Sequence, residues 1–256
     1  MRIAAIQHDI HWEDRDATLA HLTPSITRAA AGGAELVVLT EMFATGFSMR
    51  THLTAEPADG PTMSWLAEQA AEHDVVLTGS LPLTRDDDPT GLPTNAMVVV
   101  GPGGLLARYD KLHPFSYAGE HERFQPGDRP VSLELGGLRV GLSVCYDLRF
   151  APLYWHRDPP VDVEVVVANW PEARSHHWRA LATARAIENQ TYLVAVNRVG
   201  HGGELAYRGD SCILDPLGQV LVGAAHEETT LVAELSAERV AEVRGRLPFR
   251  DDRRTW

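Results

Sequence analysis

Cysteine is scarce in this sequence. Only Cys145 and Cys212 occur among 256 residues, and they lie far apart. Two cysteines cannot form the multi-bridge framework of a small secreted protein, and no Cys-x-x-Cys pair indicates a metal site. The scarcity is typical of a reducing compartment, so we expect a cytoplasmic protein.

Long apolar runs and an excess of basic charge are also missing. No stretch reaches the ~18 apolar residues of a membrane-spanning helix, and the N-terminal residues lack the apolar core of a signal peptide. Lys and Arg total 23 against 35 Asp and Glu, which gives a net charge of −12. This balance argues against nucleic acid or an anionic membrane as a partner. It does not exclude a small anionic substrate, because a few local cations can hold one.

Short apolar runs rich in β-branched residues alternate with helical patterns along the whole chain. There is no repeat, low-complexity tract or flexible linker, so we expect residues 1–256 to form a single domain. The alternation, together with turn signals typical of hairpins, predicts a mixed α/β sandwich. Helices are expected over residues 16–31, 61–73, 175–189 and 236–246, with a kink or a later start at Pro24. Strands are expected over residues 3–6, 36–39, 75–77, 97–100, 105–110, 138–144, 163–168, 192–196, 211–214 and 220–222.

Three of the predicted strands are followed by residues with catalytic potential. Glu41, Lys111 and Cys145 come at or just after the ends of apolar runs. If the strands bring these ends together, the carboxylate can take the thiol proton as a general base. The ammonium can stabilise the thiolate and the oxyanion of acyl transfer, and the backbone N–H of Tyr146 offers a second oxyanion donor. The alternative is a buried structural cysteine with two unrelated strand-end charges.

The motifs around these residues resemble the nitrilase superfamily of carbon–nitrogen hydrolases, and most closely its omega-amidase branch. The resemblance implies a four-layer α-β-β-α sandwich, a homodimer or larger assembly, and no metal or organic cofactor. It implies a Glu41–Lys111–Cys145 triad that hydrolyses the terminal amide of 2-oxo acid amides through a thioester. It also implies a supporting glutamate, which we assign to Glu120, with Glu122 as the fallback. The matching motifs are Glu41-Met-Phe-Ala-Thr-Gly-Phe47, Tyr109-Asp-Lys-Leu-His-Pro-Phe115, Cys145-Tyr-Asp-Leu-Arg-Phe150 and Val167-Ala-Asn-Trp-Pro171.

A 2-oxo acid amide carries a carboxylate, so its pocket should contain a cation. Arg149 is the first candidate, because arginine suits bidentate carboxylate recognition, and Arg174 is the second. The alternative for Arg149 is an internal ion pair with Asp147 or with a neighbouring acid. The residues expected to line the pocket or contact substrate are Tyr146, Phe43, Tyr117 and Trp170, with core packing as the alternative for the aromatic side chains.

Other functions stay open at this point. The same triad serves amidases and N-carbamoyl hydrolases with other small substrates, and a non-catalytic metabolite-binding protein is a further alternative. A metal site at His176-His177 is disfavoured, since adjacent helical residues do not share a face. Two positions depart from the family pattern: Thr40 stands where Pro is usual, and Pro114 where many members have Leu.

Overall fold

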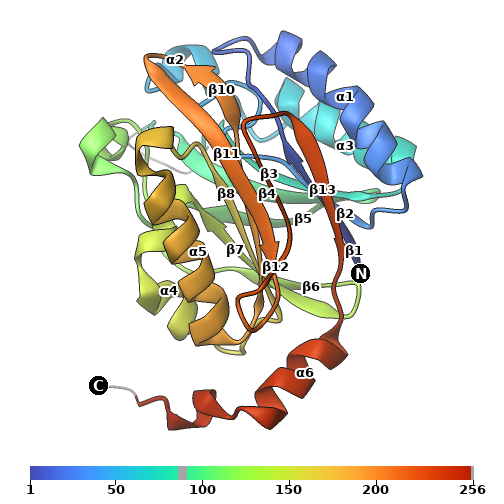
Figure 1. Ribbon diagram of the computed structural model, residues 1–256. Coiled ribbons are helices and arrows are strands. Elements are labelled where there is room, and N and C mark those ends of the chain that lie inside the picture. Colours follow the sequence, from blue (N-terminus) through green and yellow to red (C-terminus); the bar gives the residue numbers. More distant parts are fainter. Residues whose placement is uncertain (86–90, 255–256) are drawn as a thin grey trace.

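The strands of the protein form two mixed sheets, as shown by a computed structural model that describes residues 1–85 and 91–254 (Figure 1). The order in the first sheet is β13 (Thr229–Glu234), β1 (Arg2–Gln7), β2 (Leu36–Val38), β3 (Val76–Leu83), β4 (Thr94–Gly101) and β5 (Gly104–Asp110). The order in the second is β10 (Val199–Gly202), β11 (Leu205–Leu214), β9 (Tyr192–Asn197), β8 (Val163–Ala168), β7 (Leu138–Val144) and β6 (Ser132–Leu135), with β12 (Val220–Ala225) also paired to β11.

Helices cover the outer face of each sheet, which gives the predicted four layers. The main apolar core lies between the sheets and joins residues such as Val38 and Met97 to Val144 and Val165. A second cluster packs α1 (Arg15–Ala31) and α3 (Pro61–His73) on the first sheet. A third packs α4 (Ala151–Trp155) and α5 (Ser175–Asn189) on the second. The remaining helices and short turns are α2 (Thr51–Thr54), α6 (Ala237–Arg246), η1 (Ser116–Ala118), η2 (Glu120–Glu122), η3 (Cys145–Arg149), η4 (Glu172–Arg174) and η5 (Phe249–Asp252).

The predicted helices are confirmed, with small differences at their starts. Helix α1 begins at Arg15 with Asp14 as its cap, and it contains Pro24 rather than starting after it. Ser236 caps α6 by accepting a hydrogen bond from the Arg239 N–H. Ser175 is the first residue of α5 rather than its cap, because Arg174 occupies the capping position. No helix in the described ranges is long and apolar enough to cross a membrane.

Strand direction explains why the motif residues meet. Strands β1, β2 and β3 are parallel, while β4 is antiparallel to β3 and β5 is antiparallel to β4. Strand β5 therefore runs in the same direction as β2, and both end at the edge of the sheet where β4 begins. In the second sheet β7, β8 and β9 are parallel, so the residues that follow them also share one edge.

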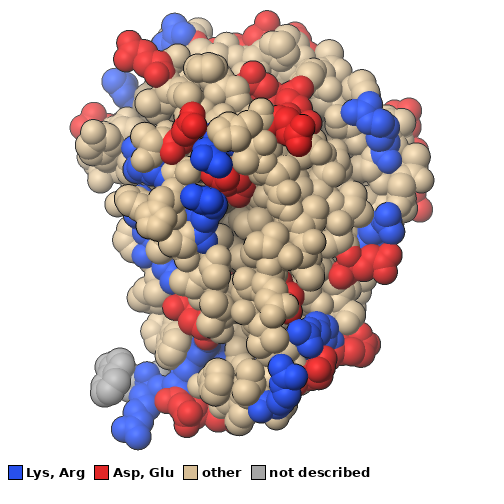
Figure 2. Space-filling model, in the orientation of Figure 1, with Lys and Arg blue, Asp and Glu red and all other residues tan. Residues whose placement is uncertain are grey.

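The surface carries both signs of charge. On the face shown in Figure 2, the described Lys and Arg side chains are interspersed with Asp and Glu side chains.

Candidate active site

Glu41 lies just beyond β2 and is fully buried. The chain around it is fastened to β3: the Ser80 N–H donates to the Thr40 carbonyl at 3.2 Å, and the Phe43 N–H donates to the Ser80 carbonyl at 3.0 Å. Met42 adopts a positive φ of 41°, which turns the chain sharply after Glu41. The carboxylate is thus presented from a short, tightly anchored turn.

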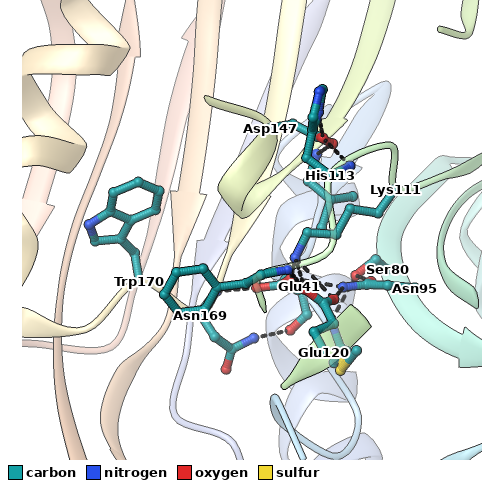
Figure 3. A network of polar contacts seen from close by, with 12 residues as sticks. Glu41, Ser80, Asn95, Lys111, His113, Glu120, Asp147, Asn169 and Trp170 are labelled. Carbon is teal, nitrogen blue, oxygen red and sulfur yellow. Dashed lines mark hydrogen bonds and ion pairs between the residues drawn. The ribbon is translucent and has the colours of Figure 1, made fainter. Parts of the chain in front are cut away.

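Lys111 follows β5 and lies between two buried carboxylates (Figure 3). Its Nζ donates to Glu41 Oε1 at 2.9 Å and to Glu120 Oε2 at 2.8 Å. Burial alone would lower the pKa of Lys111, but the charges of Glu120 and Glu41 outweigh it and raise the pKa. The ammonium is therefore held protonated although it is buried.

Glu120 occupies the start of η2 and is fully buried. It accepts hydrogen bonds from the Phe115 N–H and from Asn95 Nδ2 in addition to Lys111. Burial raises the pKa of Glu120, Lys111 opposes this rise, and the charge of Glu41 adds to it. Glu122, the fallback for this position, has an exposed side chain and lies outside the cluster.

Asn169 connects the second sheet to Glu41. Its backbone N–H donates to Glu41 Oε2 at 2.8 Å, and its side-chain Nδ2 donates to the Glu41 carbonyl at 2.5 Å. Asn197, at the end of β9, holds the next residue by accepting from the Trp170 N–H at 2.7 Å and donating to its carbonyl at 3.0 Å. The ends of β8 and β9 thus set the position of Glu41 from the opposite sheet.

Cys145 is a free thiol that starts η3, directly after β7. Its φ of 47° is in the left-handed region, so the chain makes a sharp strand-to-turn bend at the sulfur. Burial raises the pKa of Cys145, and the charge of Glu41 and a hydrogen bond to it raise the pKa further, while Lys111 lowers it. The resting group is a thiol that needs a base. The next amide, that of Tyr146, is at the start of a helical turn, where N–H groups have no intrahelical partner.

Asp147 does not pair with Arg149, which was the alternative role for that arginine. Its buried carboxylate accepts instead from the Tyr109 hydroxyl at 2.7 Å and from the Val144 N–H at 3.0 Å. The Arg149 guanidinium lies 4.8 Å from the centre of the Trp170 ring, and its Nη2 is 3.2 Å from His177 Nδ1. Arg149 is therefore available to a ligand.

A small pocket, about 60 Å³ in volume, opens beside Cys145. Both Arg149 and Arg174 line it, and within residues 1–85 and 91–254 no acidic side chain forms an ion pair with either. Tyr207, which the sequence analysis did not select, is also in its wall. Burial raises the pKa of Tyr207 to about 12, Arg198 opposes this rise, and the charge of Glu41 adds to it. The other lining residues are Phe47, Phe115, Ala118, Tyr146, Asn169, Trp170, Pro171 and Leu205.

Two aromatic residues expected in this pocket lie elsewhere. Phe43 is fully buried in the cluster beneath α1 and α3, with its ring 6.1 Å from that of Trp65. Tyr117 is 87% exposed, and its ring leans on Phe115 from outside. The positive φ of Met42 directs the next side chain into the core, while η1 turns Tyr117 away and leaves Ala118 in the wall. Trp170 and Tyr146 do line the pocket.

The described part of the chain contains no cluster of three or more His, Cys, Asp or Glu side chains that could hold a metal ion. Within the cluster, the Lys111 ammonium pairs with the Glu41 and Glu120 carboxylates, whereas the buried Asn169 Oδ1 has no hydrogen-bond partner in the described ranges. The arrangement has the parts of acyl transfer, which are a thiol, a base, a fixed cation and the backbone amide of Tyr146.

Comparison with known proteins gives consistent matches along the chain. The family model described as carbon-nitrogen hydrolase matches residues 2–245. The omega-amidase YafV of Escherichia coli strain K12 is 36% identical over 261 residues, which span 100% of this chain and 99% of that protein. The 2-oxoglutaramate amidase of Bacillus subtilis strain 168 is 33% identical over 223 residues, covering 86% of this chain and 85% of the relative.

Solved structures agree with this. A carbon–nitrogen hydrolase superfamily protein from Xanthomonas campestris, XC1258, carries an arsenic adduct in its active site. It superposes with a TM-score of 0.93 at 36% identity and covers 100% of this chain and 98% of its own. A mutant amidase from Nesterenkonia sp. AN1, solved after Michael addition of acrylamide at its active-site cysteine, has a TM-score of 0.83 at 28% identity, covering 97% of this chain and 98% of its own.

Proposed function

The chain belongs to the carbon–nitrogen hydrolase family, in its omega-amidase branch, and we propose that it hydrolyses the terminal amide of 2-oxo acid amides such as 2-oxoglutaramate and 2-oxosuccinamate. One observation carries the proposal. The buried Glu41–Lys111–Glu120 cluster lies next to Cys145, and Cys145 lines a pocket with two arginines that have no acidic partner in the described ranges. A thiol site of this kind serves acyl transfer, and the arginines suit a substrate with a carboxylate.

In the first half of the reaction, Cys145 is the nucleophile and Glu41 is the general base. Glu41 takes the thiol proton as the sulfur attacks the amide carbonyl. The Lys111 ammonium and the Tyr146 N–H stabilise the oxyanion that forms, and both are fixed before the substrate arrives. Glu41 then returns the proton to the leaving nitrogen, the C–N bond breaks, and ammonia departs from a thioester on Cys145.

The second half repeats the proton transfers with water. Glu41 deprotonates a water molecule that attacks the thioester carbonyl, and the oxyanion forms again beside Lys111. The C–S bond breaks, the proton returns to the sulfur, and the 2-oxo dicarboxylate leaves. The sum consumes one amide and one water and yields one carboxylate and one ammonium ion, so no redox partner is needed.

Substrate selection depends on the pocket rather than on the triad. Arg149 lies against the Trp170 ring, and Arg174 lies 5.5 Å from the centre of the Phe115 ring. A guanidinium that lies over an aromatic ring can still donate N–H groups to a carboxylate. We assign the distal carboxylate of the substrate to Arg149 first and to Arg174 second.

The proposal is tested by incubating the protein with 2-oxoglutaramate and measuring ammonia. Wild type should release ammonia, Cys145→Ala should not, and Cys212→Ala should behave like wild type because Cys212 lies on β11 away from the pocket. Mass spectrometry after rapid quench should show an acyl group on Cys145. Absence of ammonia release by wild type, or full activity in Cys145→Ala, would refute the assignment.

A substrate panel separates this reaction from related ones. Aliphatic amides, N-carbamoyl amino acids and nitriles would use the same triad, so hydrolysis of one of these instead of 2-oxoglutaramate would move the assignment within the family. If Cys145 neither hydrolyses any member nor reacts with iodoacetamide, the chain is a non-catalytic binding protein.

We also propose that residues 1–256 act as one domain, since both sheets supply the site, and that the protein assembles as a homodimer or larger oligomer. Exposed apolar residues near the end of α5 and on β12 support assembly: Ile187 is 51% exposed, Val220 is 65% and Leu221 is 49%. Light scattering after gel filtration measures the assembly. A cytoplasmic location is consistent with two free cysteines, one of which must stay reduced to react.

A further inference from the structure

We propose that Asn95 is a positioning residue that fixes the proton-accepting oxygen of Glu41, and that Ser80 fixes Asn95. This inference rests on the proposed function, because it concerns how the same base is held. Neither residue belongs to the motifs that identify the family, and neither lines the pocket. Both are buried next to the cluster of Glu41, Lys111 and Glu120 (Figure 3).

Asn95, near the start of β4, lies between the two carboxylates. Its Nδ2 donates to Glu41 Oε1 at 2.8 Å and to Glu120 Oε1 at 3.0 Å. Both hydrogens of one neutral amide are therefore used, one on each acid. This placement stabilises two negative groups at close range without adding a second cation.

The direction of the Asn95 amide is set from both ends. Ionised carboxylates only accept hydrogen bonds, so the amide nitrogen must face Glu41 and Glu120. The amide oxygen then faces Ser80, whose hydroxyl donates to it at 2.7 Å. Ser80 can donate in this direction because its oxygen accepts from the Met42 N–H at 2.9 Å. Hydrogen bonds thus run in one direction from Met42 through Ser80 and Asn95 to the acids.

Ser80 also holds the backbone of the base itself. Its N–H donates to Thr40 and its carbonyl accepts from Phe43, so the residues on both sides of Glu41 are bonded to one residue of β3. The same serine therefore sets the Glu41 backbone and the amide that holds the Glu41 side chain. A shift of the Glu41 backbone therefore also moves the Asn95 amide.

The hydrogen bonds to the two Glu41 oxygens determine which oxygen is open to the Cys145 proton. A carboxylate oxygen has two lone-pair directions. Oε1 of Glu41 uses both, for Asn95 Nδ2 and Lys111 Nζ, whereas Oε2 accepts the Asn169 N–H and no other N–H group of the described part of the chain. The open position on Oε2 is therefore the one that takes the proton of Cys145. Asn95 determines this by occupying Oε1.

The test follows the alkylation of Cys145 by iodoacetamide as a function of pH, read by mass spectrometry of the Cys145 peptide. Below the pKa of the thiol, this rate requires a base that takes the thiol proton, so the position of its acidic limb reports how well the site stabilises the Glu41 carboxylate beside Glu120. The other titratable groups that act on Glu41 are Lys111, Cys145 and Tyr207. The assay needs no substrate, so it gives an answer even if 2-oxoglutaramate is not hydrolysed.

Asn95→Ala removes a donor from each acid, so the acidic limb should move to higher pH by about one unit, the size expected for hydrogen bonds to charged groups. Ser80→Ala leaves the donors but frees the amide to turn, so it should move the limb in the same direction by less. Thr78→Val is the matched control, because it removes a buried hydroxyl of β3 that donates only to the Val98 carbonyl. Its limb should coincide with that of wild type.

The proposal would be overturned if the acidic limb stayed unmoved in both Asn95→Ala and Ser80→Ala while their stability fell as in Thr78→Val. Asn95 would then have a merely structural role. If Asn95→Ala does not fold, Ser80→Ala alone decides between the two results. A wild-type protein that shows the predicted shifts yet releases no ammonia from 2-oxoglutaramate would refute the proposed substrate and leave this inference intact.

Discussion

His113 and Asp147 fasten the segment that carries Lys111 to the turn that carries Cys145. Oδ1 of Asp147 accepts the His113 N–H at 3.0 Å and lies 2.8 Å from His113 Nδ1. The His113 ring also stacks on Phe150, with ring centres 3.8 Å apart. Because Lys111 and Cys145 come from different sheets, this contact helps to set the distance between cation and nucleophile.

Asp147→Asn should disturb that distance. In either orientation the amide nitrogen would face a donor: the Tyr109 hydroxyl and the Val144 N–H at the Oδ2 position, or the His113 N–H at the Oδ1 position. We expect a loss of about 2–4 kcal/mol in the free energy of unfolding, typical of a broken buried network, and a fall in kcat of at least about tenfold. Urea unfolding and ammonia release measure the two effects. Asp128→Asn, at an exposed position, is the control, and wild-type kcat in Asp147→Asn would contradict the prediction.

Arg149→Gln should weaken the binding of anionic substrates selectively. Loss of a charge-assisted bidentate contact should raise KM for 2-oxoglutaramate roughly 10- to 100-fold, with a smaller change in kcat. A neutral amide such as butyramide lacks the carboxylate, so its KM should stay near the wild-type value. Arg174→Gln tests the second candidate, and Arg179→Gln, exposed on α5 and outside the pocket, serves as the control. Equal effects on both substrates would argue against carboxylate recognition.

His8 should make the fold sensitive to acid. Its ring is buried between the Ile6 and Phe43 carbonyls, and burial lowers its pKa from 6.5 to about 4, although both hydrogen bonds oppose the change. The unfolded chain therefore binds a proton at higher pH than the folded protein. The free energy of unfolding is unaffected by His8 above about pH 6.5. It falls as the pH drops toward 4, and the loss due to His8 amounts to roughly 3 kcal/mol.

Chemical unfolding at pH 7, 5.5 and 4.5 measures this loss. His8→Gln cannot take up a proton in this range, so its unfolding free energy should fall less steeply over the same interval. Parallel curves for the two proteins would show that other groups dominate the acid response.

The site residues that could be predicted from the sequence are those that follow the ends of apolar runs. Glu41, Lys111 and Cys145 follow strands whose β-branched residues are easy to identify, and chain direction then places their side chains at one edge. The strands that were missed show the limit of this reasoning. Strand β13 pairs with β1, where Arg2 lies opposite Glu234, and no local pattern reveals a partner so distant in the chain.

The supporting residues were missed for a related reason. Asn95 and Ser80 lie within ordinary strands, and their importance comes from contacts with Glu41 and Glu120, which only the assembled sheet creates. Tyr207 lies on β11 and reaches the pocket because that strand pairs with β9. Phe43 shows the converse, since its proximity to Glu41 in sequence suggested the pocket, whereas one residue with positive φ sent it to the core.

Thr40 is a position at which the protein should gain stability. Its Oγ1 is buried and has no hydrogen-bond partner in the described part of the chain, and a buried hydroxyl without a partner costs free energy on folding. Thr40→Val replaces the hydroxyl with a methyl of similar size, so the free energy of unfolding should rise by about 1 kcal/mol and Tm by roughly 2–4 °C. The matched control is Thr18→Val, because the buried Thr18 hydroxyl donates to the Asp14 carbonyl at 2.9 Å and accepts from the His11 N–H at 3.1 Å. Thr18→Val should therefore lower the free energy of unfolding. If Thr40→Val and Thr18→Val lose similar amounts of stability in thermal unfolding, the buried Thr40 hydroxyl does not destabilise the fold.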